Sequence, residues 1–184
     1  MDTERLYFRK WEESDAEELF RYAKDPKVGP IAGWPPHTSV ENSREIIHNV
    51  LSAEGTFALI LKQTDLPIGC IGVKLGEATD LTDREDECEI GYWIGVPYWG
   101  QGLMTEAGRE ILRYAFQYLQ MKKVWAGYYD GNLRSKRVQE KLGFRYHHTS
   151  ADVPVPLMNE TRTGHVNCLT YEDWKKMQPG EFGA

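Results

Sequence analysis

The spacing of apolar positions divides the chain into short strands and amphipathic helices. Compact or alternating apolar runs predict strands at residues 6–9, 56–61, 68–75, 88–94, 123–128, 144–148 and 166–171. Apolar side chains three or four positions apart predict helices at residues 15–23, about 39–51, 102–119 and 132–142, with Ser14 as the cap of the first helix. The predicted order of elements is therefore β-α-α-β-β-β-α-β-α-β-β.

Turn residues indicate how these elements connect. Asp65-Leu66-Pro67 lies between two apolar runs and predicts an antiparallel hairpin, whereas the strand–helix–strand passages after residue 88 need at least one parallel pair. Proline and glycine recur so densely in residues 29–36 that we expect no regular structure there, and the acidic residues 80–87 predict a solvated loop.

These patterns predict one fold class and one domain. The class is α/β (α+β), with a single mixed, mostly antiparallel sheet of six or seven strands and helices on both faces. The sequence contains no internal repeat, low-complexity tract or long linker, so residues 1–184 are expected to form a single domain.

Composition narrows the location and the partners. The 184 residues include 22 Lys and Arg against 28 Asp and Glu, for a net charge of −6, which argues against nucleic acid as a partner. The longest apolar run, residues 57–61, is far too short to cross a membrane, and the charged N-terminus does not resemble a signal peptide, so we expect a cytoplasmic protein that binds no membrane. Cys70, Cys88 and Cys168 have neither disulfide-framework nor metal-site spacing, and no metal is expected.

A strand-to-helix turn is the most informative segment for chemistry. It reads Tyr98-Trp99-Gly100-Gln101-Gly102-Leu103-Met104-Thr105-Glu106-Ala107 and opens the predicted helix at residues 102–119. Backbone N–H groups at residues 100–105 have no partner within such a helix start, and they suit an anion such as a pyrophosphate. An ordinary turn that uses glycine for positive φ explains the same residues. A Rossmann motif would need glycine where Thr105 stands.

Two motifs in this order resemble a known family. Residues 89–94 followed by residues 98–107 resemble the acetyl-CoA signature of the GNAT acetyltransferase superfamily, and most of all the branch that acetylates N-terminal alanine or serine of ribosomal proteins. Residues 132–135 with 140–144, the opening at residues 3–9 and 14–17, and the close at residues 169–171 with Trp174 agree with that branch. Two positions depart from the superfamily pattern: Trp99 stands where Gln or Arg is usual, and Gly95-Val96 replaces Asp-Pro.

The resemblance implies where acetyl-CoA binds. In the family fold, two parallel strands, here residues 88–94 and 123–128, splay apart and hold the pantetheine arm, with Trp93 and Ile94 as its backbone partners. A backbone N–H near Ile94 is expected to stabilise the oxyanion. The remaining cofactor-binding residues expected from the resemblance are Trp99, Gly100, Gln101, Gly102, Leu103, Met104, Thr105, Asn132 and Ser135.

Two side chains are candidates for the chemistry of acetyl transfer. An amine arrives protonated, so a base must remove a proton, and Glu89 acting through water is the candidate, with a solvent-facing strand carboxylate as the alternative. The departing thiolate needs a proton or a hydrogen bond, and the family branch uses a serine at the position of Ser135, which otherwise reads as a helix-start serine that serves the backbone. Asn132 reads equally well as an N-cap.

The sequence therefore predicts an acetyl-CoA-dependent N-acetyltransferase whose acceptor is a primary amine. The N-terminal α-amine of a protein or peptide is the favoured acceptor. A small-molecule amine, or a non-catalytic acyl-CoA-binding sensor, is the alternative. The loops at residues 26–38 and 151–164 are expected to build the acceptor pocket, and either a monomer or a homodimer is compatible with the sequence.

Overall fold

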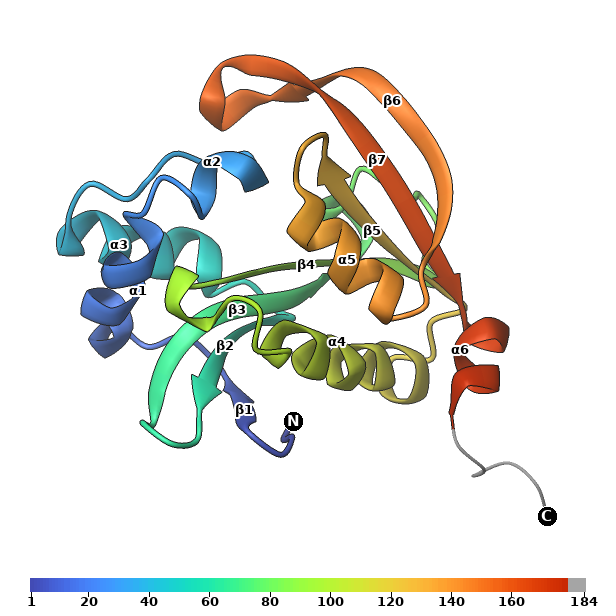
Figure 1. The fold of residues 1–184 in the computed structure, drawn as a ribbon, viewed down its shortest axis with the longest axis horizontal. Coiled ribbons are helices and arrows are strands. Elements are labelled where there is room, and N and C mark those ends of the chain that lie inside the picture. The colour runs from blue at the N-terminus through green and yellow to red at the C-terminus, as the bar shows by residue number, and fades with distance from the viewer. Residues whose placement is uncertain (179–184) are drawn as a thin grey trace.

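The computed structural model describes residues 1–178 and contains one seven-stranded sheet flanked by helices (Figure 1). The strands are β1 (Leu6–Arg9), β2 (Thr56–Leu61), β3 (Leu66–Lys74), β4 (Glu87–Ile94), β5 (Lys123–Tyr129), β6 (Arg145–Val155) and β7 (Glu160–Thr170). The helices are α1 (Ala16–Ala23), α2 (Gly29–Ala32), α3 (Val40–Ile46), α4 (Leu103–Arg113), α5 (Leu133–Lys141) and α6 (Tyr171–Met177).

The strands lie in the order β1-β2-β3-β4-β5-β7-β6, and every neighbouring pair is antiparallel except β4 and β5. The connection from β4 to β5 runs through α4, as a parallel crossover requires. The predicted fold class, a mixed and mostly antiparallel sheet with one parallel pair, is confirmed.

The parallel pair is short. Its register joins Glu87 to Lys123, Cys88 to Val124 and Glu89 to Trp125, after which β4 and β5 diverge. The remaining residues of each strand therefore face a gap in the sheet. The predicted splay between these two strands is confirmed, and it leaves backbone groups of β4 and β5 without each other as partners.

Each face of the sheet has its own apolar cluster. Alternation along β4 sends Ile90 and Ile94 into the cluster that also contains the buried face of α4 and Leu142 after α5. Trp93 points the other way, into the cluster formed with α1 and with Ile47, which follows α3. Helices therefore cover both faces, and the gap between β4 and β5 lies between the two layers.

The segment at residues 29–36 differs from the expectation of no regular structure. Residues Gly29–Ala32 form the short helix α2. Pro30 lies in its first turn, where a missing N–H is not needed for helical hydrogen bonds, and Gly33 ends the helix with a φ of 94°. Proline and glycine thus bound a single turn here.

The start of the first helix also differs from the prediction. A 3-10 turn, Glu13–Asp15, precedes α1, and the Asp15 carboxylate accepts a hydrogen bond from the Glu12 N–H at 2.9 Å. Ser14 therefore does not cap this helix. Later predicted helices are confirmed in place, although each of the two long ones ends in a π-helical turn, at residues Ile47–Leu51 and Tyr114–Tyr118.

The C-terminal third contains more regular structure than the sequence predicted. β6 and β7 are each 11 residues long and form a hairpin. Most of residues 151–164, which were expected to form a loop, therefore belong to these two strands. Glu87, expected in a solvated loop, is buried as the first residue of β4, and α6 was not predicted. The hairpin arches above α2 (Figure 1), where Arg162 donates a hydrogen bond to the Pro30 carbonyl.

Candidate active site

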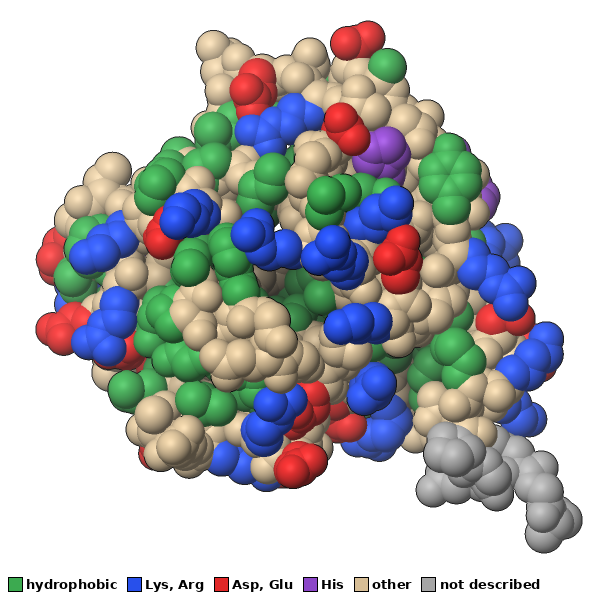
Figure 2. Space-filling model, in the orientation of Figure 1, with side chains coloured by type: hydrophobic (Ala, Val, Ile, Leu, Met, Phe, Trp, Pro, Cys, Tyr) green, Lys and Arg blue, Asp and Glu red, His purple; other side chains and the backbone are tan. Residues whose placement is uncertain are grey.

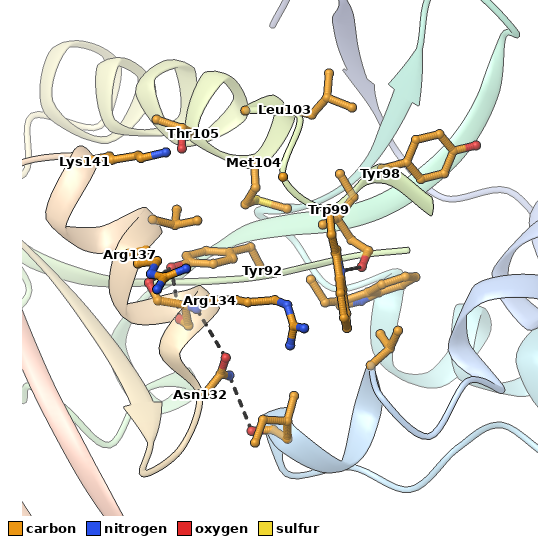
Figure 3. Close-up of a pocket in the computed structure, with 18 of the residues that line it drawn as sticks. Tyr92, Tyr98, Trp99, Leu103, Met104, Thr105, Asn132, Arg134, Arg137 and Lys141 are labelled. Atoms are coloured by element: carbon orange, nitrogen blue, oxygen red, sulfur yellow. Dashed lines mark hydrogen bonds between the residues drawn. The ribbon is translucent and has the colours of Figure 1, made fainter. Parts of the chain in front are cut away.

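A cavity of about 310 Å³ opens where β4 and β5 diverge. Its walls come from the end of β4, the loop into α4, the first turn of α4, one face of α5 along its length, and the region of α2 (Figure 3). The structure brings together here every cofactor-binding residue expected from the sequence except Gln101, namely Trp93, Ile94, Trp99, Gly100, Gly102, Leu103, Met104, Thr105, Asn132 and Ser135. The Gln101 side chain instead donates to the Pro97 carbonyl at 2.8 Å, outside the cavity.

The loop into α4 presents a cradle of backbone donors. Gly100 and Gly102 have φ values of 75° and 78°, a conformation that glycine adopts without strain. Within residues 1–178, the N–H groups of residues 100–105 have no hydrogen-bond acceptor. A Cβ on Gly100 would meet no atom within 4 Å, so the space in front of this backbone is open. Such donors at the positive end of a helix dipole suit a phosphate group.

The N-terminal segment holds this cradle in place. Glu106, in the first turn of α4, accepts hydrogen bonds from the Thr3 hydroxyl at 2.6 Å and from the Arg5 backbone and side chain at 2.8 and 2.7 Å. Arg5 also donates to the Gln101 carbonyl at 3.0 Å. Burial would raise the pKa of Glu106, but these hydrogen bonds outweigh burial and lower it, so the carboxylate is charged. Residues 3–9 and 98–107 were both singled out in the sequence, but their contact with each other was not predicted.

Trp99 closes one side of the cavity. Its indole N–H donates to the Ile94 carbonyl at 2.9 Å, which fixes the ring at the end of β4. The Arg134 guanidinium lies 3.8 Å from the ring centroid, reaching across from α5 (Figure 3). This cation–π contact spans the cavity mouth between the cradle and α5.

Four cations surround the cavity: Lys27, Arg134, Arg137 and Lys141. Among residues 1–178, none of the four has an ion-pair partner, and Figure 2 shows Lys and Arg side chains gathered around an apolar hollow on this face. A positive rim on a chain of net charge −6 favours a polyanionic ligand. This rim was not predicted from the sequence, although the helical spacing of Arg134, Arg137 and Lys141 places them on one face of α5.

Ser135 lies at the inner end of the cavity. Its hydroxyl is 3.1 Å from the Tyr92 hydroxyl and accepts a hydrogen bond from the Gln139 amide at 3.2 Å. Burial raises the pKa of Tyr92, although hydrogen bonds from Ser135 and Gln139 oppose that effect, so Tyr92 is a neutral phenol. The predicted N-cap at Asn132 is confirmed: its side chain accepts from the Ser135 N–H at 3.2 Å.

Glu89 lies apart from the cavity, on the Trp93 face of β4. Its carboxylate accepts hydrogen bonds from Lys74 at 2.8 Å and from the Thr79 hydroxyl at 2.7 Å, and its side chain is 14% exposed. The two predicted catalytic residues therefore approach the gap between β4 and β5 from opposite faces of the sheet. Neither role is tested by this arrangement, and both stay predictions.

The fold and this site define a class of protein that binds a phosphate-bearing ligand where two parallel strands splay apart. The family model described as "Acetyltransferase (GNAT) domain" matches residues 5–145. The chain belongs to the GNAT acetyltransferase family and is an acetyl-CoA-dependent N-acetyltransferase, as its sequence motifs predicted.

Individual relatives agree with this assignment. An uncharacterized N-acetyltransferase, p20, of Bacillus licheniformis is 35% identical over 149 residues, which cover 78% of this chain and 80% of the relative. The ribosomal protein uS5-alanine N-acetyltransferase of Escherichia coli is 31% identical over 87 residues, 47% of this chain and 44% of that protein. A GNAT-family acetyltransferase structure from Bacillus anthracis superposes with a TM-score of 0.76 at 25% identity, over 94% of this chain and 98% of that one.

The described helices contain no segment that is both long enough and apolar enough to span a bilayer.

Proposed function

We propose that this enzyme transfers the acetyl group of acetyl-CoA to the N-terminal α-amine of a protein or peptide. The observation that carries the reaction is the cavity at the β4–β5 gap, because it combines backbone N–H donors, unpaired cations and the Ser135 hydroxyl. Support for the acceptor class comes from the relative named as a ribosomal protein alanine N-acetyltransferase.

The residues present fit the co-substrate. The N–H groups of residues 100–105 suit its diphosphate, and the cations of α5 suit its further phosphate. Trp93 pairs with Cys70 of β3, whereas Ile94 faces the gap without a β5 partner. The Ile94 N–H is therefore available to an amide of the pantetheine arm, as to an added strand, while its carbonyl accepts from the Trp99 indole. Acetyl-CoA supplies an activated thioester carbonyl, and the chain's own residues supply orientation and proton handling.

The amine is proposed to approach from the face that carries Glu89. Positions 91 and 127 lie on either side of the gap, and a side chain at either one would point to this face. Both residues are glycine, so no side chain from these two positions covers the opening. A Cβ would come no nearer than 3.6 Å to Lys74 at position 91 and 3.7 Å to Leu81 at position 127, and these two side chains bound the opening. A primary amine passes such an opening more readily than a bulkier secondary one. Glu89, through water, accepts the proton that the amine must lose.

The opposite face handles the leaving group. As the C–N bond forms and the C–S bond breaks, the electron pair of the C–S bond goes to sulfur. Ser135 donates a hydrogen bond to that sulfur. The proton lost from nitrogen balances the proton gained by the free thiol, so the products are an N-acetylated amine and CoA.

A thiol-release assay tests the acceptor class. Purified protein with acetyl-CoA is incubated with peptides that begin with free alanine or serine, with the same peptides blocked at the N-terminus, and with small amines. Release of CoA with the free peptides and none with the blocked peptides is the expected result. Turnover confined to small amines would overturn the acceptor assignment, and CoA binding without turnover on any amine would indicate a sensor.

Two substitutions test the proposed catalytic roles. Glu89→Gln should lower kcat by at least tenfold with little change in CoA affinity, since it removes a base and leaves the cavity intact. Glu85→Gln, at an exposed acid nearby, is the matched control and should be neutral. Ser135→Ala should lower kcat in the same way. Unchanged kinetics for either variant would remove that residue from the mechanism.

A further inference from the structure

Gln139 is a fully buried polar side chain whose role neither the family motifs nor the cavity explains. It lies on α5 at 0% exposure, and all of its amide atoms have partners. Its Nε2 donates to the Gly127 carbonyl at 3.3 Å and to the Ser135 hydroxyl at 3.2 Å, while its Oε1 accepts from Asn167 at 2.7 Å. One amide thus links α5, β5 and β7 behind the serine.

The Gly127 carbonyl decides which way this amide points. A carbonyl oxygen can only accept, so the amide nitrogen must face it, and the amide oxygen is left for the Asn167 donor. Gly127 has no β4 partner because the two strands part after Trp125. The splay of the sheet therefore provides the acceptor that fixes Gln139.

The orientation of Gln139 fixes the role of Ser135 in turn. A serine hydroxyl has one hydrogen to donate and two lone pairs to accept with. Because Gln139 donates to Ser135, the serine hydrogen cannot point back at the amide. The Tyr92 hydroxyl has the Ser135 carbonyl at 3.2 Å as an acceptor of its own. The serine hydrogen is then left to the Tyr92 oxygen or to the cavity.

We propose that Gln139 is a positioning residue: by donating to the Ser135 hydroxyl, it directs the serine hydrogen toward the sulfur of CoA. The proposal rests on the proposed function, in which Ser135 serves the leaving thiolate. No proton or electron is transferred by Gln139 itself. Its contribution is to set the direction of two hydrogen bonds: the amide donates to the serine hydroxyl, and the serine hydroxyl then donates to the sulfur.

Titration of the bound CoA thiol tests this directly and needs no acceptor amine. CoA alone is bound to the protein, and the ultraviolet absorbance of its thiolate is followed against pH in the wild type, Gln139→Met, Ser135→Ala and the double variant. A free thiol titrates near pH 8.5, and a hydrogen bond to the thiolate lowers that pKa. We expect Ser135→Ala to raise the bound thiol pKa by about one unit, Gln139→Met to raise it by a large part of that, and the double variant to match Ser135→Ala.

The outcomes separate the two levels of the proposal. A wild-type thiol pKa in Gln139→Met, or a full additional shift in the double variant, would overturn the positioning role while leaving the proposed function standing. An unchanged pKa in Ser135→Ala would overturn the donor role on which it rests. Failure of the wild type to bind CoA would overturn the cofactor site itself.

A second variant guards against loss of folding in Gln139→Met. Gln139→Glu keeps the shape of the side chain, still accepts from Asn167, and cannot donate to Ser135 when ionised. Its bound thiol pKa should lie above that of the wild type, as in Gln139→Met, whereas a wild-type value would contradict the proposal. Melting temperature and CoA affinity, measured for every variant, show that the fold and cavity persist. Gln117→Met, at an exposed glutamine, is the matched control.

Discussion

Substitution of Gly100 is predicted to affect both protein stability and CoA affinity, whereas a matched glycine elsewhere should affect stability alone. Gly100→Ala forces alanine into a φ of 75°, which costs about 1–2 kcal/mol, but its Cβ meets no protein atom within 4 Å. In a chain of this size each kcal/mol lowers Tm by about 2–4 °C. Gly76→Ala, with a φ of 52° and equally open surroundings, carries a comparable strain and lies outside the cavity lining.

Only the methyl group on Gly100 stands where a phosphate is expected. Loss of one hydrogen bond to a charged group amounts to about 1.5–3 kcal/mol, so CoA affinity should fall by about 10- to 100-fold in Gly100→Ala and stay unchanged in Gly76→Ala. Differential scanning calorimetry gives the two Tm values, and titration calorimetry with CoA gives the two Kd values. Equal CoA affinity in the two variants would refute the assignment of residues 100–105 as the diphosphate cradle.

Three further predictions follow from the rim, a buried carboxylate and a strand contact. Arg137→Gln combined with Lys141→Gln should weaken CoA binding by about tenfold at low salt and less at high salt, measured by titration calorimetry, because both cations are exposed and unpaired. Glu87 has a lowered pKa despite burial, since Trp125, Thr82 and Lys123 bind its carboxylate. The stability that ionised Glu87 contributes is thus fully present above the pKa of the unfolded state. It is lost as the pH falls through the lower pKa of the folded state. Glu87→Gln should therefore flatten the acid side of the stability curve, by at most about 1.4 kcal/mol per pH unit in urea titrations. Gly69→Ala places a Cβ 2.4 Å from the Trp93 carbonyl and should lower Tm by more than Gly100→Ala does.

Each of these predictions has an outcome that contradicts it. Salt-independent CoA binding by the rim variant would show that its charges do not face the ligand. An unchanged acid slope in Glu87→Gln would show that other carboxylates set acid stability. Gly91→Ala, whose Cβ would come no nearer than 3.6 Å to the Lys74 side chain, is the control for Gly69→Ala and should leave Tm within a few degrees. A similar Tm loss in both glycine variants would disprove the steric argument.

Local signals predicted most of the fold, because periodicity and turn residues act over short distances. The β2–β3 hairpin, the glycine-led start of α4 and the crossover from β4 to β5 were all readable in this way. The turn of that hairpin was placed too late, because it lies at residues 62–65, and Leu66 and Pro67 already pair with β2 as the start of β3. Residues 145–155 and 160–170 were read as shorter strands because their polar side chains hide the alternation. They are held in strands mainly by cross-strand pairing, which sequence spacing does not encode.

The same distinction between local and long-range signals applies to the candidate site. Contiguous motifs marked the cradle at residues 100–105 and the Asn132–Ser135 turn, since each lies on one piece of chain. The contacts of Glu106 with Thr3 and of Gln139 with Asn167 join residues far apart in sequence, so only the fold shows them. The position of Glu89 beside Lys74 likewise depends on the pairing of β3 with β4.

The short β4–β5 pairing has a consequence for how well the folded protein resists proteolysis. Only three residue pairs join the two strands, so part of the hydrogen bonding between β4 and β5 is missing in the free protein. A ligand that lies along β4 would supply those missing hydrogen bonds. Binding to the folded state alone adds about 2.7 kcal/mol of stability when the ligand stands at one hundred times its Kd. Resistance of the folded enzyme to proteolysis should then rise with the concentration of acetyl-CoA.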